Sequence, residues 1–316
     1  MKTNNTTSDI TNNEFNDKQL EQIYVGRYYG LDTSVYADPK YNWKQMECIR
    51  MGLQDGVDTS IYANPDFNEY QMREIFFGLK YELDVSIYTS LDFTWKQMSQ
   101  IRLGLCDELD VSVYAHPDFD WEQMREIRWG LKNHFNFNIY ADTRYNSLQL
   151  FQIRKGMESL VPVIVYADPK YNWQQMEQIR LGLYYHLDVS VYADPKYTWK
   201  QMAEIRMGMN AGVSVSIYAD PKYTWEQMEE IRLGLEDDLD ISIYADPKFN
   251  YRQMEQIRLG LRDELDVGIY AHPDFNWDQM NEIRCSLEEK VDIEIVKFYA
   301  NPNFDTRSMR YDFHNM

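Results

Sequence analysis

The chain has 316 residues, of which 44% are hydrophobic and 15% aromatic, and its formal net charge is −19 at neutral pH. This composition is sufficient for a packed core and excludes a disordered chain. The acidic excess disfavours binding to nucleic-acid backbones or anionic membranes and favours a basic partner protein. No apolar stretch approaches the roughly 20 residues that span a bilayer.

A segment of 26 residues recurs along almost the whole chain. The tyrosines that open its clear copies are Tyr36, Tyr62, Tyr88, Tyr114, Tyr140, Tyr166, Tyr192, Tyr218, Tyr244 and Tyr270. A fixed period of this length is typical of a solenoid, in which each unit packs only against its neighbours. We therefore predict a single repeat solenoid over residues 10–298, preceded by a flexible polar tail at residues 1–9.

Three copies depart from the common pattern. Residues 10–35 form a degenerate first copy, and residues 299–316 form a degenerate C-terminal cap, as expected for end units that have one neighbour only. The copy at residues 140–165 has Ser147 in place of tryptophan and Leu150 in place of methionine. We predict a bend, a hinge or a special contact surface in this atypical copy.

In each copy, the residues after the opening tyrosine predict a helix of about twelve residues. In the first clear copy, Asn42 is a preferred N-cap, and Gln45 is placed to complete a capping box. Tyr41 and Met46 take the N′ and N4 positions of a hydrophobic staple. A preferred cap and the following glutamine recur in all ten clear copies, including Gln175. These glutamines are therefore interpreted as structural.

Two further features of the predicted helix recur. Trp43, Met46 and Leu53 form an apolar stripe at helical spacing, which we interpret as core. A glycine such as Gly52 or Gly182 costs about 1 kcal/mol relative to alanine inside a helix. It is present in nine of ten clear copies, which suggests that the backbone of the next unit approaches closely there.

The segment Leu-Asp-Val-Ser-x-Tyr-Ala follows the end of the helix, expected near Gly56 and its equivalents, and has two interpretations. Its alternating β-branched residues favour a strand, whereas Asp188 and its equivalents are good N-caps for a one-turn helix. Three extra residues in the last copy would invert the faces of a strand, but would only lengthen a helix by about one turn. We predict an all-α solenoid of about eleven repeats, each with one long and one short helix; the alternative is a strand-plus-helix solenoid.

An arginine recurs beside the predicted stripe, as at Arg50 and Arg180, and Phe76 replaces it in one copy. A charge in this position needs a partner. We expect internal pairing with aspartates such as Asp58, or stacking on a tryptophan of the adjacent unit. The alternative is a row of arginines that faces a ligand.

The chain carries no glycine-rich phosphate loop, HExxH, CxxC or GxSxG motif. Its three cysteines, Cys48, Cys106 and Cys285, indicate neither a disulfide framework nor a metal site, so a reducing cytoplasm is predicted. His116 and His272 are interpreted as loop caps. Because nearly every polar group recurs in copy after copy, whereas catalysis needs a unique constellation, the chain is predicted not to be an enzyme and to need no cofactor or metal.

The residues in which the copies differ are better candidates for function, since solenoids use extended faces as docking surfaces. Exposed aromatic side chains are suited to protein–protein hot spots. The candidate partner-binding residues are Tyr81, Trp129, Tyr184, Tyr185, Glu236, Asp237 and Asp238.

At the motif YADPKYxWxQMxxIRxGLxxxLDVS, the chain resembles uncharacterised repeat proteins of bacteria and their mobile elements. The resemblance covers about residues 10–300 and implies no activity. The leading hypothesis is a non-enzymatic protein-binding scaffold. One alternative is an acidic decoy that mimics DNA and inhibits a nucleic-acid-binding host defence protein; the other is a self-assembling structural rod. Duplex DNA carries one charge per roughly 1.7 Å, so a net charge of −19 permits a local decoy patch and not a full-length mimic.

Overall fold

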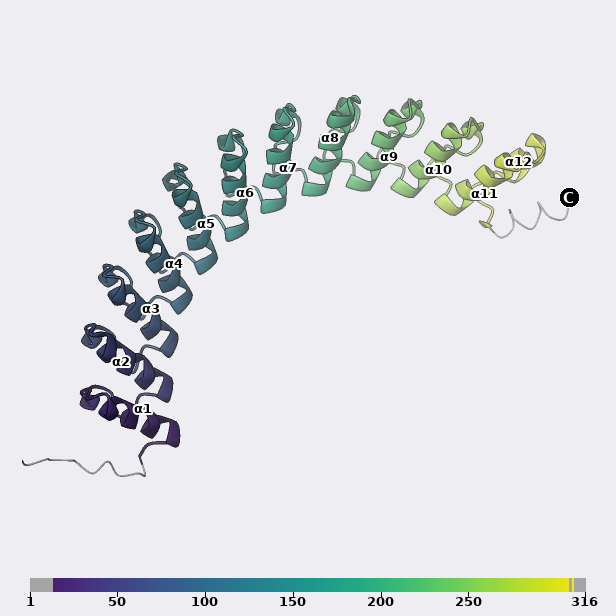
Figure 1. Cartoon of the computed structure of the whole chain (residues 1–316). Helices are drawn as coiled ribbons and strands as arrows, with labels where there is room; N and C mark the ends of the chain where they lie inside the picture. Colours follow the sequence, from purple (N-terminus) through teal and green to yellow (C-terminus); the bar gives the residue numbers. More distant parts are fainter. Residues whose placement is uncertain (1–13, 307–308, 310–316) are drawn as a thin grey trace, which may run out of the picture. The chain divides into compact units, whose positions relative to one another are not determined.

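The computed structural model describes residues 14–306 and Met309, and every regular element in that part of the chain is a helix (Figure 1). The all-α prediction is therefore confirmed, and the strand-plus-helix alternative is wrong for these residues. The tail predicted at residues 1–9 lies outside the described residues, as does most of the predicted C-terminal cap after Thr306.

Each copy contributes one long α-helix and one short helix. The α-helices are α1 (Asp17–Tyr28), α2 (Trp43–Asp55), α3 (Glu69–Lys80), α4 (Trp95–Cys106), α5 (Trp121–Lys132), α6 (Ser147–Glu158), α7 (Trp173–Tyr184), α8 (Trp199–Ala211), α9 (Trp225–Glu236), α10 (Tyr251–Arg262), α11 (Trp277–Glu288) and α12 (Ile293–Tyr299). The short 3-10 helices are η1 (Thr33–Val35), η2 (Thr59–Ile61), η3 (Val85–Ile87), η4 (Val111–Val113), η5 (Phe137–Tyr140), η6 (Val163–Val165), η7 (Val189–Val191), η8 (Val215–Ile217), η9 (Ile241–Ile243) and η10 (Val267–Ile269).

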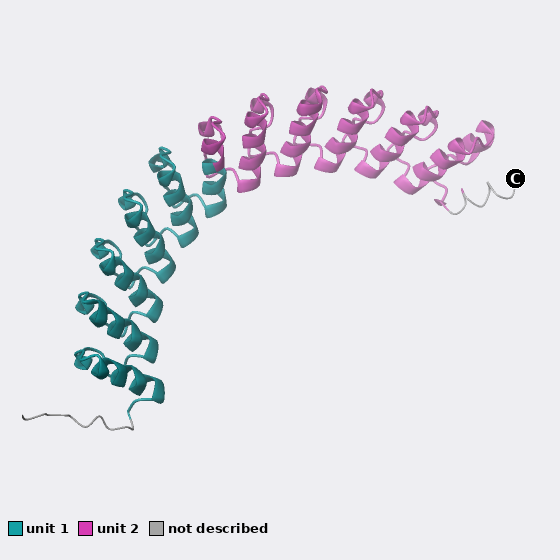
Figure 2. Cartoon of the chain, viewed as in Figure 1, with its two compact units in different colours: residues 1–154 teal, residues 155–316 magenta. Residues whose placement is uncertain are grey.

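The chain divides into two compact units, residues 1–154 and residues 155–316, with the boundary inside α6 (Figure 2). In the first unit, α1 to α5 pack in sequence order, each against the next. In the second unit, α7 to α11 do the same. Each unit therefore has the neighbour-to-neighbour packing of an α-solenoid.

The glutamine of each capping box has two structural roles. Gln45 Oε1 accepts the Asn42 N–H at 2.7 Å, and the Asn42 side chain accepts the Gln45 N–H, which confirms the predicted capping box. The other end of the same amide, Nε2, donates to the Phe67 carbonyl of the next copy at 2.6 Å. In the second unit, Gln175 bonds in the same way to the Tyr197 carbonyl. Each glutamine therefore starts its helix and also ties one copy to the next.

The inner glycine makes room for a tyrosine side chain. A Cβ at Gly52 would lie 1.9 Å from the Tyr62 hydroxyl oxygen, and one at Gly182 would lie equally close to the Tyr192 hydroxyl. The Tyr62 hydroxyl is buried and donates to the Cys48 carbonyl at 3.3 Å. The expectation of a close backbone approach is therefore wrong, because the neighbour is the tyrosine that opens the next copy.

The long helices end near Gly56 and its equivalents, as predicted, and the residue at that position lies in the left-handed region. Gly56 adopts φ 74° after α2, and its N–H donates to the Leu53 carbonyl while the next N–H donates to the Gly52 carbonyl. This is the Schellman arrangement. Most other copies place a residue with a side chain there, at φ values of 54° to 60°: Glu82, Glu108, His134, Leu160, His186, Asp238, Glu264 and Lys290.

The short segment is a single helical turn. Asp188 accepts the Ser190 N–H at 3.1 Å and so caps η7, as predicted. In the last copy the three extra residues extend the segment to the seven-residue α12. The length argument made from the sequence is thus confirmed.

The tryptophans are not core residues, which corrects the predicted stripe. Met202 is fully buried, whereas Trp199 is 38% exposed. Tryptophan occupies the first position of the helix, where a cation from the preceding helix can lie over its ring. Lys200 Nζ lies 4.1 Å from the ring centroid of Trp225, and Lys96 Nζ lies 4.6 Å from that of Trp121. The tryptophans therefore contribute to a surface contact between helices.

The short helices on either side of α6, one in the atypical copy and one at its junction with the preceding copy, lack side-chain caps. Neither Asn136 before η5 nor Pro162 before η6 makes a side-chain capping hydrogen bond. Leu160 and Ile164 are 91% and 77% exposed, respectively. The bend, hinge or contact surface expected here stays a prediction.

Candidate functional site

The recurring arginines pair with a side chain of the preceding copy. The arginine Nε donates to a glutamine or glutamate that lies 28 residues earlier, at distances of 2.7 to 3.1 Å. The pairs are Arg50–Gln22, Arg102–Glu74, Arg128–Gln100, Arg154–Glu126, Arg206–Gln178, Arg232–Glu204, Arg258–Glu230 and Arg284–Gln256. The predicted internal pairing is confirmed for these arginines. We call this series the Arg–Gln/Glu ladder.

The aspartate expected as a partner of the arginines was wrong. Asp58 accepts the Ser60 N–H at 3.0 Å and caps η2, so it does not serve an arginine. The other expectation, stacking on a tryptophan of the adjacent copy, is confirmed for one arginine: Arg154 lies 5.4 Å from the ring centroid of Trp129 on α5. The first-position tryptophans receive the cations of other residues instead.

Burial controls the electrostatics of the ladder. Glu204 and Glu230 are buried, and burial raises the pKa of each carboxyl group although Arg232 and Arg258 act to lower it. A buried carboxylate of this kind requires its guanidinium partner. Arg232 and Arg258 are also buried. This part of the ladder therefore stabilises the packing of adjacent copies and does not present a row of cations to a ligand.

The ladder is interrupted once among the clear copies. Phe76 stands where the other copies have arginine, and Cys48, 28 residues earlier, stands where they have glutamine or glutamate. Both members of the pair are therefore replaced together by less polar residues. Phe76 is only 2% exposed and Cys48 is also buried, so the exchange leaves neither member of a broken ladder pair as a buried, unpaired charge.

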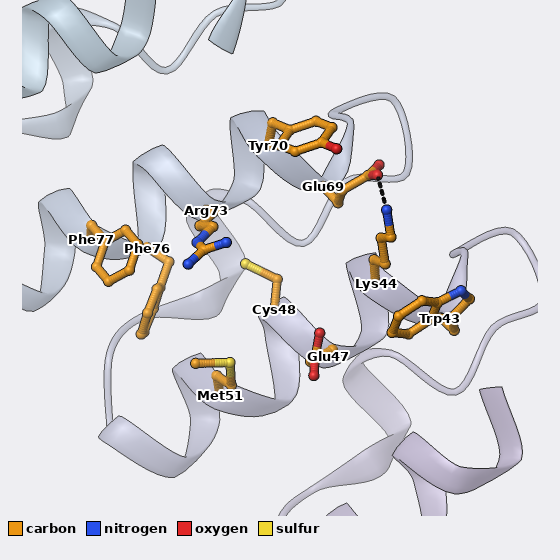
Figure 3. A pocket seen from close by; sticks show the side chains of 10 residues that line it. All are labelled: Trp43, Lys44, Glu47, Cys48, Met51, Glu69, Tyr70, Arg73, Phe76 and Phe77. Carbon is orange, nitrogen blue, oxygen red and sulfur yellow. Dashed lines mark hydrogen bonds and ion pairs between the residues drawn. The ribbon is translucent and has the colours of Figure 1, made fainter. Parts of the chain in front are cut away.

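A pocket opens at this interruption. It has a volume of about 450 Å³ and lies between α2 and α3 (Figure 3). The lining residues are Trp43, Lys44, Glu47, Cys48, Met51, Glu69, Tyr70, Arg73, Phe76 and Phe77. Glu69 stands where most copies have tryptophan, and its carboxylate forms an ion pair with the Lys44 ammonium group at 3.2 Å. Three copy-specific residues, Cys48, Glu69 and Phe76, thus meet in one place.

The Cys48 thiol in this pocket is expected to be unreactive. Burial raises the pKa of Cys48 to about 12, and Arg73 lowers it only in part. The thiol is therefore neutral at physiological pH, and a neutral thiol is a poor nucleophile. Cys48 acts here as a small apolar wall residue.

The predicted partner-binding residues are exposed and belong to four different copies. Tyr81, Trp129, Tyr184 and Tyr185 are each 48–57% exposed. Tyr81 caps the end of α3 and stacks on Phe77, with ring centroids 6.4 Å apart. Tyr184 and Tyr185 lie edge to face at the end of α7, with centroids 5.3 Å apart.

The predicted acidic residues lie at the end of α9. Glu236 accepts a hydrogen bond from Arg232 at 2.8 Å, so it is partly committed to the frame. Asp237 and Asp238 are exposed, and Asp238 has φ 54°. This segment is therefore a solvated helix end.

The pocket was missed by the sequence analysis, although its signal was present. Phe76 was seen as a departure, but the paired exchange of Cys48 becomes visible only when positions 28 residues apart are compared. That spacing corresponds to no contact within a single helix, so nothing in the local pattern pointed to it.

No family model, curated protein or solved structure matches the chain. In the part of the chain that the structure describes, no group of three or more His, Cys, Asp or Glu residues is arranged to hold a metal ion. None of the described helices combines the length and the apolar character of a membrane-spanning segment.

Proposed function

We propose that the protein is a non-catalytic scaffold that binds a protein partner through the side chains in which its copies differ. The observation that carries this proposal is that, within each copy, the recurring polar residues form hydrogen bonds inside the protein. The recurring glutamines, arginines, tyrosines and aspartates bond to the frame itself, as Gln45, Arg232, Tyr62 and Asp188 show. Repeated polar groups are therefore used for structure, which leaves the copy-specific residues for recognition.

The Tyr184–Tyr185 pair is the best anchor among these copy-specific residues. Both rings are about half exposed, and they hold each other in an edge-to-face arrangement. Tyrosine supplies large contact area with little conformational entropy and is enriched in binding hot spots. A partner that covers both rings is thus expected to depend on them strongly.

A displayed library of random peptides, selected on the immobilised full chain, tests the proposal. The expected binders lose about tenfold or more in affinity for Tyr184→Ala/Tyr185→Ala, since hot-spot truncations cost about 2 kcal/mol or more. Tyr28→Ala/Tyr29→Ala is a matched control, because these tyrosines occupy the same two positions at the end of α1 and also lie 5.3 Å apart.

Two outcomes would contradict the proposal: no enriched peptide, or equal loss of binding in both double variants. Binding that is abolished by moderate salt and by competing DNA would instead support the acidic decoy.

A further inference from the structure

The groove between α2 and α3 is empty because a guanidinium is missing from it. In the neighbouring groove, the Arg102 side chain crosses from α4 to Glu74 on α3 at 2.7 Å. In the α2–α3 groove the corresponding Phe76 turns into the core and cannot reach across. The resulting volume, about 450 Å³, falls in the range of about 300–1,000 Å³ that is typical of ligand pockets.

The floor of the pocket is apolar. Phe76, Phe77 and Met51 line one end of it, and the neutral thiol of Cys48 lies between them and the helix starts (Figure 3). Water in such a space finds few hydrogen-bond partners, so an aromatic or large aliphatic side chain would displace it favourably.

The rim of the pocket carries one unpaired charge of each sign, beside one ion pair. Lys44 and Glu69 neutralise each other at the end nearest the helix starts. Glu47 on α2 and Arg73 on α3 also line the pocket, and neither forms an ion pair with any residue that the structure describes. The rim thus presents a negative group on one helix and a positive group on the other.

We propose that the α2–α3 pocket binds a protein segment through an aromatic or large aliphatic anchor flanked by one basic and one acidic residue on the same face. In an extended segment, residues i, i+2 and i+4 share a face and span about 13 Å. This span suits charges carried by helices that pack about 10 Å apart. The inference deepens the proposed function and rests on it, because it names the chemistry of the partner.

Four blocked pentapeptides probe the site, each titrated with the full chain and followed by NMR shifts of the peptide. Lys-Ser-Phe-Ser-Glu is expected to bind most tightly. Replacing its phenylalanine with alanine is expected to weaken binding about 30-fold or more, as for the loss of a buried aromatic side chain. Lys-Ser-Phe-Ser-Lys and Glu-Ser-Phe-Ser-Glu are expected to bind about two- to fivefold more weakly, as for one exposed ion pair each.

Variants of the chain locate the binding. Cys48→Gln/Phe76→Arg restores the pair seen at Gln22 and Arg50, at 3.0 Å, and should fill the pocket and abolish binding in a folded protein. Met51→Ala should weaken binding severalfold, whereas Met207→Ala, at the same position beside a groove that keeps its Arg232–Glu204 pair, should not. These two methionines lie toward the surface, so the comparison holds even if the double variant fails to fold.

Arg73→Glu supplies a test of charge that does not depend on folding of the core, since Arg73 is exposed. The variant should prefer Lys-Ser-Phe-Ser-Lys over the dipolar peptide. Any of three results would overturn the inference. The first is an Arg73→Glu variant with the same peptide preference as the parent protein, and the second is an alanine peptide that binds as tightly as the phenylalanine peptide. The third is an equal loss of binding in Met51→Ala and Met207→Ala. A concentration-dependent dimer that disappears in Cys48→Gln/Phe76→Arg would assign the pocket to a second copy of the chain and also overturn it. If these peptides fail while library binders still require Tyr184 and Tyr185, only the pocket inference falls.

Discussion

Replacing Gly182 with alanine tests the central packing contact of the repeat. The added Cβ would lie 1.9 Å from the Tyr192 hydroxyl oxygen and 2.8 Å from Val189 Cγ1. Because both distances are far inside van der Waals contact, the buried tyrosine must move, and its hydroxyl loses the 3.1 Å bond to the Gln178 carbonyl. Overpacking costs about 1–3 kcal/mol and the lost hydrogen bond about 1 kcal/mol. Alanine regains about 1 kcal/mol of helix propensity, so a net loss of about 1–3 kcal/mol is expected.

The size of this loss should depend on the tyrosine hydroxyl. Tyr192→Phe removes the atom nearest to the new Cβ, so Gly182→Ala/Tyr192→Phe should be less destabilised than the sum of the single variants, by about 1 kcal/mol. Urea unfolding gives the midpoints, and hydrogen exchange of α7 reports the local effect, since repeat arrays need not unfold in one step. Gly268→Ala is a control with little expected effect, because other copies carry serine at this exposed position. A Gly182→Ala protein as stable as the parent would refute the reasoning.

The chain contains a natural version of this substitution. Ser286 stands at the glycine position of the last clear copy, and its hydroxyl donates to the Glu282 carbonyl at 2.9 Å. The tyrosine that follows, Tyr299, is buried, and its hydroxyl has no hydrogen-bond partner among the described residues. The serine hydroxyl therefore takes the carbonyl that the tyrosine hydroxyl uses elsewhere. In both Ser286 and Gly182→Ala, the added side chain separates the tyrosine hydroxyl from that carbonyl.

Other consequences of the structure can be measured directly. Leu160→Gly should stabilise the protein by about 1 kcal/mol in urea unfolding, because Leu160 adopts φ 57° and a side chain in the left-handed region costs about 1–2 kcal/mol; an unchanged midpoint would contradict this. Burial raises the pKa of Tyr62 and Tyr114. Their contribution to the free energy of unfolding is therefore complete below the pKa of tyrosine in the unfolded chain, about 10, and is lost as pH rises through the higher pKa of the folded state. In an alkaline titration, the buried tyrosines should therefore ionise, as seen by phenolate absorbance, only at the pH at which the helices unfold. Ionisation of all tyrosines without loss of helix would contradict this prediction. Iodoacetamide at pH 8 should modify the exposed Cys106 well before Cys48, whose pKa is raised to about 12 by burial; mass spectrometry showing equal rates would exclude this.

The helix starts could be predicted from the sequence because their causes are local. Asn42 and Gln45 are three residues apart, and the bonds between them depend only on the first turn of one helix. The helix ends are similarly local, since the left-handed residue follows directly from the Schellman hydrogen bonds. The short helix was recognised because three added residues in the last copy could be accommodated by α12 without reversing a buried face.

The candidate pocket could not be predicted from local patterns, because its causes act between copies. The pairing of Arg232 with Glu204 joins residues 28 apart on adjacent helices, and no rule for a single helix contains that interval. The role of Gly182 was misjudged for a related reason: the atom that needs the space is the hydroxyl of Tyr192, which reaches back from the next copy. Helical periodicity also placed Trp199 in the core, although the first turn of a helix has fewer neighbours than its middle.

The exchange of an arginine pair for Cys48 and Phe76 shows how a repeat frame can acquire an individual site at little cost in stability. Removing only Arg258 would leave the Glu230 carboxylate buried without its ion-pair partner, with an expected loss of about 3–5 kcal/mol. Replacing both members by apolar residues avoids that loss, because the desolvation cost disappears together with the attraction. The tyrosine frame is unaffected, since Tyr62 bonds to the backbone carbonyl of Cys48 and not to its side chain. A paired exchange therefore changes the surface chemistry of one groove while the helices on either side keep their packing.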